Sequence, residues 1–263
     1  MSMDPRTRSQ LLALSDAFYR AHAVAFDVSR GHHAWPGWQR LLEWLPTPDS
    51  TRATADQRLT VLDIGCGNAR LVPFLDNAGF GLAYTGVDAN AALLLAARER
   101  LKERPGDDCQ LIHQDFLACD LPGDRLPGGP FRLIAIMGVL HHVPGRDWRL
   151  RLLQAAALRL ARGGILALAT WQFADRARFA RRRVAWSELG PVLGEEVDVG
   201  CLEDGDALLR FGDDPKRPPR YCHQVADAEF EAWPEQLGLE SLAEFRSDGV
   251  QGDLNRYRVL VRR

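Results

Sequence analysis

The sequence of 263 residues has little of several residue types that mark particular classes of protein. Lysine occurs twice against 31 arginines, a ratio that we attribute to a GC-rich genome. The five cysteines form no Cys-x-x-Cys pair, which favours a reducing compartment and argues against a disulfide framework or a cysteine-rich zinc site, so no metal is expected. No uncharged run reaches the roughly 18 residues that span a bilayer, and residues 1–8 lack the apolar core of a signal peptide. We therefore expect a cytoplasmic protein without a membrane partner.

A large net charge of either sign is also absent. The 33 basic and 35 acidic residues leave a formal charge of −2, which excludes a uniformly basic nucleic-acid binder. The charges are nevertheless segregated, because residues 141–190 carry +7 and residues 191–215 carry −7. The basic block suits a phosphate backbone, but the acidic block that follows can fold over it and neutralise it. The sequence alone leaves both outcomes open.

The pattern of apolar residues predicts an α/β protein. Short apolar runs alternate with helical patterns from residue 59 to residue 170, which is typical of a parallel sheet covered by helices on both faces. Asn90 is expected to cap the helix after the second strand, and Leu152, Ala156 and Leu160 mark the helix after the fourth. The predicted strands are 59–64, 82–87, 111–113, 131–137 and 165–170, followed by a terminal antiparallel hairpin of 242–246 and 255–261.

Two segments lie outside this alternation. Residues 1–57 are expected to form an N-terminal helical cap and linker, because apolar residues at helical spacing over about 9–25 are followed by a Trp-Pro break and a polar loop. Residues 58–263 form the main predicted domain. It carries an insertion at about 172–222, where the alternation of strands and helices is lost.

The strongest functional signal is a glycine turn between the first strand and the helix after it. Gly65 and Gly67 allow the backbone to approach a ligand closely. A dinucleotide fold needs a third small residue at the sixth position of this turn, where this sequence has Arg70. Asp63 precedes the turn instead. A carboxylate there suits S-adenosylmethionine, which has no pyrophosphate but carries an α-ammonium and a sulfonium.

Two more acids follow the next two strands. Asp88 is placed to accept hydrogen bonds from both ribose hydroxyls, with Ala89 beside it. Asp115 can accept one from the adenine amino group while Phe116 packs on the ring. Met137, at the end of the fourth strand, completes the predicted cofactor site. A lone glycine turn is most often structural, but three acids after three successive strands point to a ligand.

The glycine turn, the three acids and the element order together resemble class I S-adenosylmethionine-dependent methyltransferases over about residues 59–170. The resemblance implies a Rossmann-like sheet, S-adenosylmethionine as cofactor and S-adenosylhomocysteine as product. One departure is Ala69, where that family often has a third glycine.

The sequence after the fourth strand restricts the methyl acceptor. It has neither an Asn/Asp-Pro-Pro-aromatic box nor a Pro-Cys pair, so adenine amino groups and the covalent cytosine mechanism are not expected. His141 and His142 stand there instead. His142 is a candidate catalytic base for a hydroxyl acceptor, or both histidines line the cofactor pocket or cap the next helix.

Flanking segments resemble the tRNA wobble-uridine methyltransferases, which esterify the carboxylate of 5-carboxymethyluridine. The resemblance rests on residues 26–30 with Trp35 and Pro36, and on residues 220–223. Arg30, as a catalytic residue, and Arg220 are the candidates for holding a carboxylate or phosphate. Aromatic stacking on a base and further substrate contacts are expected from Trp35, Trp171, Tyr221, His223 and Asn255, with core packing as the alternative for the aromatic residues.

A carboxylate acceptor is already an anion at pH 7, so methyl transfer to it requires positioning rather than a base. The expected function is methylation of a tRNA wobble-uridine carboxylate, with tRNA as partner and, as in eukaryotic relatives, a small activating partner protein. The alternatives are a small-molecule O- or N-methyltransferase and a non-catalytic S-adenosylmethionine-binding module.

Overall fold

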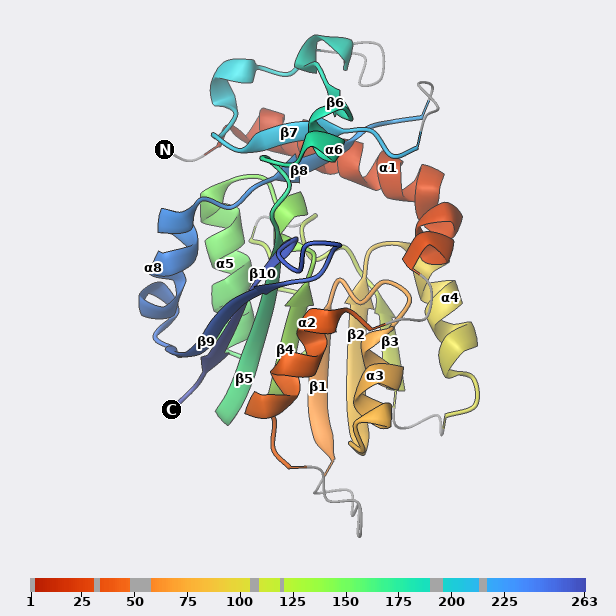
Figure 1. The fold of residues 1–263 in the computed structure, drawn as a ribbon, viewed down its shortest axis with the longest axis vertical. Helices are drawn as coiled ribbons and strands as arrows, with labels where there is room; N and C mark the ends of the chain where they lie inside the picture. The colour runs from red at the N-terminus through yellow and green to blue at the C-terminus, as the bar shows by residue number, and fades with distance from the viewer. Residues whose placement is uncertain are drawn as a thin grey trace.

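A seven-stranded, mostly parallel sheet organises the molecule (Figure 1). The computed structural model describes residues 3–30, 34–47, 58–104, 109–118, 121–189, 196–212 and 217–263, without the side chains of residues 29 and 30. The strand order is β3-β2-β1-β4-β5-β10-β9, and β10 runs antiparallel to both of its neighbours. The strands are β1 Leu59–Ile64, β2 Leu82–Asp88, β3 Cys109–His113, β4 Phe131–Met137, β5 Leu160–Trp171, β9 Glu240–Ser247 and β10 Asn255–Val261. The predicted Rossmann-like sheet with a terminal antiparallel hairpin is confirmed.

Helices cover both faces of this sheet because its central strands are apolar on both sides. Along β1, Val61 belongs to one core and its neighbour Leu62 to the other, as the period of two in a strand requires. The first core is closed by α2 Pro36–Leu41, α3 Leu71–Asn77 and α4 Ala91–Leu101. The second is closed by α5 Arg146–Ala157 and α8 Asp227–Leu237.

Two segments that are distant in sequence build a roof over the carboxyl ends of the parallel strands (Figure 1). One is the long helix α1, Pro5–Arg30, and the other contains α6 Ala177–Ala180 and the small antiparallel sheet β6 Arg183–Val184, β7 Asp206–Leu209 and β8 Arg220–His223. Leu11 and Leu14 of α1 share a core with Leu208 and Tyr221 of this sheet. No described helix, α1 included, has the length and apolar character needed to cross a membrane.

Two elements differ from the sequence expectation. Leu160 was expected in a helix, but α5 ends at Ala157 and Leu160 begins β5, where it pairs with Phe131. Helix α8 was not predicted at all. Its signals are Phe230 and Trp233, three residues apart and buried, and Gly238, which ends the helix in the left-handed conformation.

A buried arginine connects the insertion to the helices of the main domain. Arg149 of α5 has no exposed surface, and its Nε and Nη2 donate 2.8 Å hydrogen bonds to the two carboxylate oxygens of Glu229 on α8. Its Nη2 also donates a 2.8 Å bond to Glu203, which precedes β7. The acidic block of the sequence therefore neutralises this member of the basic block inside the fold.

Replacing this arginine is expected to destabilise the protein. Arg149→Ala leaves the Glu229 carboxylate buried without a counter-charge, which costs about 3–5 kcal/mol of unfolding free energy. Urea denaturation measures the loss. The matched control is Arg151→Ala on the same helix, where the side chain is exposed and a change within about 0.5 kcal/mol is expected. Equal losses in the two variants would contradict a structural role for Arg149.

Candidate functional site

A cavity of about 820 Å³ lies at the carboxyl ends of the parallel strands and is lined in part by α1 and the small sheet. One half is lined by the glycine turn, by the acids at the carboxyl ends of β1 and β2, and by the acid that follows β3. The other half is lined by residues of α1, α6 and β8, by the end of β5, and by the loop before β10. The volume lies within the range of small-molecule and cofactor sites. We call the two halves the cofactor half and the acceptor half.

The glycine turn of the cofactor half has a backbone that only glycine adopts readily. Gly65 has φ +73°, and a Cβ added there would lie 2.3 Å from a methyl carbon of Val139. Gly67 has φ +54°, and its amide donates a 2.8 Å hydrogen bond to Oδ2 of Asp88. Oδ1 of Asp88 accepts a 2.8 Å bond from the amide of Asn90, the residue that caps α4. Asp88 therefore joins the turn after β1 to the start of α4.

Asp63, just before the turn, is a buried carboxyl group. Burial raises its pKa to about 7, although the Tyr84 hydroxyl donates a 2.8 Å hydrogen bond that opposes the shift. The carboxyl group lines the cavity, so a ligand cation placed beside it would favour its charged form.

All eight residues predicted for cofactor binding lie in the wall of the cavity: Asp63, Gly65, Gly67, Asp88, Ala89, Asp115, Phe116 and Met137. Phe116 is buried, whereas Asp115 is exposed and accepts hydrogen bonds from the amides of Leu117 and Ala118, at 2.8 and 3.1 Å. The site offers an aromatic surface and, at separate places, carboxylates that accept hydrogen bonds. This arrangement fits a ligand that joins an amino acid to a nucleoside.

Arg70 argues against dinucleotide binding in the sequence, but its charge also suits a ligand. The structure places it in the same cavity wall, with its guanidinium 5.4 and 5.5 Å from the rings of Trp35 and Trp38. A cation at the start of α3 suits the carboxylate of an amino-acid ligand. Its position directly after the glycine motif was the available signal.

The acceptor half contains a buried arginine with no anionic partner among the described residues. Arg220 begins β8 and is 7% exposed, and its guanidinium lies 4.5 Å from the ring of Trp171 and 5.5 Å from that of Phe18. Its Nε has no hydrogen-bond partner in the described part of the chain. Phe179 packs edge-on against Trp171, with ring centres 4.6 Å apart. The cavity thus offers a desolvated cation on an aromatic surface.

Other predicted substrate residues divide between the cavity and the interior. Trp35, Trp171, Arg220 and Asn255 line the cavity, and Asn255 donates a 2.7 Å hydrogen bond to Asp248. The side chain of Arg30 lies outside the described residues.

Tyr221 and His223, predicted to contact the substrate, lie away from this cavity. Neither residue lines it, and the Tyr221 hydroxyl and His223 Nδ1 both lie 2.7 Å from Oδ1 of Asp206. The reason is the period of two along β8: when Arg220 faces the cavity, Tyr221 and His223 face the opposite side.

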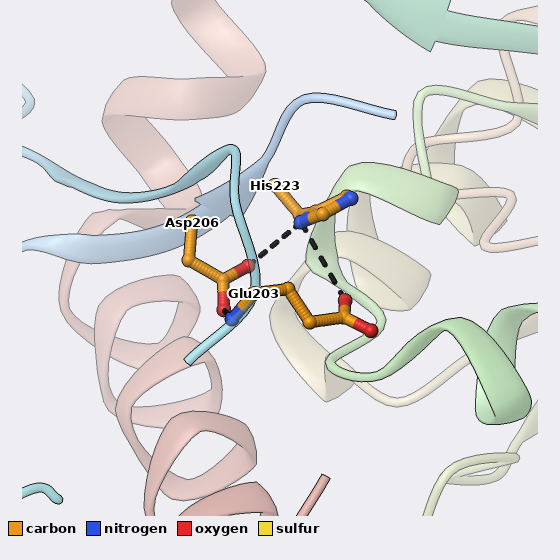
Figure 2. A group of neighbouring side chains, drawn as sticks. All are labelled: Glu203, Asp206 and His223. Atoms are coloured by element: carbon orange, nitrogen blue, oxygen red, sulfur yellow. Dashed lines mark hydrogen bonds and ion pairs between the residues drawn. The ribbon is translucent and has the colours of Figure 1, made fainter. Parts of the chain in front are cut away.

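Glu203, Asp206 and His223 form a cluster whose ligand atoms lie within 4.8 Å of one another (Figure 2). Oδ2 of Asp206 accepts a 2.8 Å hydrogen bond from the amide of Glu203, and Glu203 accepts one from Arg149. Because the Arg149 guanidinium already supplies a positive charge and hydrogen bonds here, we interpret the cluster as a structural network rather than a metal centre.

His142, the predicted catalytic base, lines the acceptor half with both ring nitrogens engaged. Its Nε2 lies 2.8 Å from the hydroxyl of Tyr19 and its Nδ1 lies 2.8 Å from the carbonyl oxygen of Tyr221. Tyr19 was not identified from the sequence, because it lies 123 residues away from His142.

Part of the basic block stays exposed beside the cavity. Arg176 pairs with Asp253 at 2.6 Å, and Arg149 pairs with Glu203. Between residues 177 and 183, four arginines are exposed and have no carboxylate partner in the described ranges; they are Arg178, Arg181, Arg182 and Arg183, which we call the basic strip. Arg178 and Arg182 line the cavity.

The central part of the chain matches a known protein family. Residues 62–166 match the family described as a methyltransferase domain. An uncharacterized protein of Synechococcus is 33% identical over 159 residues, which is 60% of this chain and 35% of that protein. The ubiquinone biosynthesis O-methyltransferase of Glaesserella parasuis is 34% identical over 166 residues, which is 62% of this chain and 63% of that protein. The match therefore spans less than two thirds of the length of these curated relatives.

Solved structures share the fold at low sequence identity. An S-adenosylmethionine-dependent methyltransferase of Clostridium acetobutylicum has a TM-score of 0.57 and 16% identity, over 93% of this chain and 98% of that one. A 1,6-didemethyltoxoflavin N1-methyltransferase of Burkholderia thailandensis, with bound S-adenosylhomocysteine, has a TM-score of 0.59 and 14% identity, over 95% and 87%. The family match supports the predicted enzyme class, a methyltransferase, for residues 62–166, and these structures show that the chain shares the fold of S-adenosylmethionine-dependent methyltransferases.

Removing the Asp88 carboxylate is expected to weaken cofactor binding. Asp88→Ala loses one or two charge-assisted hydrogen bonds to the ribose, and we expect S-adenosylhomocysteine to bind about 2–4 kcal/mol more weakly in titration calorimetry. Asp124→Ala, which removes an exposed carboxylate outside the cavity, is the control and should bind normally. Unchanged affinity in Asp88→Ala would show that the ribose lies elsewhere.

Cofactor affinity is also expected to depend on the protonation of Asp63. Because the pKa of this buried carboxyl is raised to about 7, the free protein holds a proton there at lower pH. The charged form that suits the ligand ammonium must first lose that proton. Affinity for S-adenosylhomocysteine should therefore rise by up to about tenfold per pH unit until about pH 7. In Asp63→Asn this dependence should disappear; an equally steep profile in that variant would assign the proton to another group.

Proposed function

We propose that the chain methylates a carboxylate oxygen of an aromatic acceptor bound between Arg220 and Trp171. The observation that carries the proposal is the buried Arg220 guanidinium without an anionic partner among the described residues. A buried cation is costly unless a counter-charge meets it, and the planar guanidinium matches a carboxylate with two hydrogen bonds. The ring of Trp171, 4.5 Å from the guanidinium, offers an apolar surface for the ring of the acceptor.

In this proposal, residues of the site position the two substrates and balance their charges. When bound, S-adenosylmethionine supplies an electrophilic methyl group and leaves as S-adenosylhomocysteine. Asp63 and Asp88 would hold its ammonium and ribose, and Arg70 its carboxylate. Arg220 would hold both acceptor oxygens, and a remaining lone pair on one of them would form the new bond to carbon. The acceptor is ionised at pH 7, so no residue has to remove a proton from it.

A small aromatic acid is the acceptor that the geometry supports best. The cavity of about 820 Å³ must hold both cofactor and acceptor, and α1 and the small sheet cover it. These dimensions suit a molecule of one or a few rings. The relative from Glaesserella parasuis, named as an O-methyltransferase of ubiquinone biosynthesis, supports oxygen as the accepting atom.

A second candidate is the carboxylate of a tRNA wobble uridine, with a small activating partner protein. The basic strip favours it, because Arg181 and Arg183 are exposed guanidinium groups beside, but not within, the cavity wall. A phosphate backbone crossing this strip would place one extruded base toward Trp171.

Removal of the Arg220 charge tests the carboxylate site. Arg220→Gln should lower kcat/KM for an aromatic acid about 10²-fold, since one or two charge-assisted hydrogen bonds are lost. Binding of S-adenosylhomocysteine should be unchanged. Arg181→Gln, an exposed arginine outside the cavity, is the control. Loss of activity in both variants alike would refute a specific role for Arg220.

Incubation with tritium-methyl S-adenosylmethionine and either bulk tRNA or a metabolite extract tests whether the acceptor is a tRNA or a small molecule. We expect label in the extract. Label in tRNA would favour the second candidate. In that case an Arg181→Gln/Arg183→Gln double variant should incorporate less label, and its activity on tRNA should depend less steeply on salt. Tight cofactor binding without transfer to either pool would support a non-catalytic binding module instead.

A further inference from the structure

The acceptor half contains two arginines besides the buried one of β8. Arg178 and Arg182 line its wall, and both are exposed side chains without a carboxylate partner in the described ranges. The helical turn of α6 extends to Arg182, whose amide donates a 2.9 Å hydrogen bond to the carbonyl oxygen of Phe179. Residues four apart on a helix share one side, so both arginines reach the cavity, whereas Arg181 and Arg183 do not line it.

Contacts on two sides hold this turn in place. The carbonyl oxygen of Arg182 accepts a 2.9 Å hydrogen bond from the amide of Arg210, which directly follows β7. Phe179, the buried residue of α6, packs edge-on against Trp171 at the end of β5. The backbone that carries Arg178 and Arg182 is therefore fixed relative to the aromatic surface of the acceptor half.

A line of ring contacts connects the proposed carboxylate site with α6. The Arg220 guanidinium lies 4.5 Å from the ring centre of Trp171, and that ring lies 4.6 Å from the ring of Phe179. The Arg178 guanidinium lies 4.5 Å from the ring centre of Phe179. One cation therefore lies at each end of a pair of aromatic rings that also hold both guanidinium groups in position.

The acids near these arginines are engaged elsewhere. Asp16, the acid of α1 that lines the cavity, pairs with Arg20 at 2.5 Å. Asp253 pairs with Arg176, the residue before α6, at 2.6 Å. Asp248, in the loop before β10, is buried and accepts hydrogen bonds from three other residues. An acceptor with a single carboxylate would balance only one of the three arginines in this half of the cavity.

We infer that the acceptor carries a second anionic group, which Arg178 and Arg182 bind, and that the substrates are aromatic diacids. The inference rests on the proposed methyl transfer. Arg220 holds the carboxylate that reacts. One of its oxygens forms the bond to the methyl carbon, while the carbon–sulfur bond breaks and its electrons stay on sulfur. The products are S-adenosylhomocysteine and a half-ester whose second carboxylate is still charged.

This arrangement also limits the reaction to one methyl group. A half-ester that returned with its remaining carboxylate at Arg220 would place an uncharged ester beside Arg178 and Arg182. It would gain no charge pairing there, so the half-ester should accumulate and the diester should form slowly.

The test uses the full chain, tritium-methyl S-adenosylmethionine, and five probes: benzoate, isophthalate, terephthalate and the monomethyl esters of the two diacids. The diacids place the second carboxylate at two different positions, and each monomethyl ester keeps the shape without that charge. For the better diacid we expect a kcat/KM about tenfold above those of benzoate and of its own monomethyl ester, mainly through a lower KM, which exceeds the advantage that two equivalent carboxylates give by number alone. Because exposed charges are screened by salt, this preference should shrink at about 0.5 M NaCl.

Arg178→Gln/Arg182→Gln should remove the preference for the diacid over benzoate. The matched control is Arg181→Gln/Arg183→Gln, which removes the same charge from the same strip but outside the cavity wall, and there the preference should remain. Titration with S-adenosylhomocysteine shows that each variant is folded. No preference in the unmodified chain, a preference retained in Arg178→Gln/Arg182→Gln, or an equal loss in both double variants would overturn the inference and leave the proposed function standing. Absence of labelled ester from all five probes would instead overturn the proposed function.

Discussion

The hydrogen bond from the amide of Gly67 to the carboxylate of Asp88, 2.8 Å long, fixes the geometry of the cofactor half. It requires that β1 and β2 run parallel and end together, as the pairing of Ile64 with Val87 ensures. Gly67 itself has a positive φ, which glycine adopts readily, so the chain can turn at this point. The second oxygen of Asp88 accepts a hydrogen bond from the amide of Asn90, the residue that caps the start of α4. One side chain therefore shapes the turn and, in the site that we propose, also meets the ribose, so loss of the carboxylate affects both the turn and the ligand.

The acceptor half depends on tertiary contacts rather than on one motif. Helix α1 and the small sheet share an apolar core, so Tyr19 and Arg220 reach the cavity from segments about 200 residues apart in sequence. Arg149 holds the insertion against α5 and α8 through Glu203 and Glu229. Because these contacts set the position of β8, they also set which of its side chains face the cavity. The buried network outside the cavity is in this sense a condition for acceptor binding.

The contrast between the two halves explains what the sequence could predict. The cofactor residues follow strands with strong apolar patterns, and parallel strands bring their ends to one edge, so positions such as Asp63 and Asp115 could be assigned from local patterns. The strands of the insertion are only two to four residues long and nearly all buried, so no alternation shows which side of β8 faces a ligand. The sequence therefore could not show that Tyr221 and His223 lie away from the cavity. The contact between Tyr19 and His142 joins residues 123 apart, and no spacing rule reports such a pair.

The two buried arginines, Arg149 and Arg220, differ in whether a carboxylate of the protein balances their charge. Arg149 has no exposed surface and contacts two carboxylates, Glu203 and Glu229, so its charge is balanced inside the protein. Arg220 is also buried but has aromatic rings and a cavity around it, and no carboxylate among the described residues. A guanidinium is always charged, so burial cannot be relieved by loss of a proton. Arg220 is only 7% exposed, and a planar anion beside it would gain both charge pairing and two directed hydrogen bonds. The unbalanced arginine therefore points to an anionic ligand more specifically than the exposed basic strip does, because exposed guanidinium groups are solvated without any ligand.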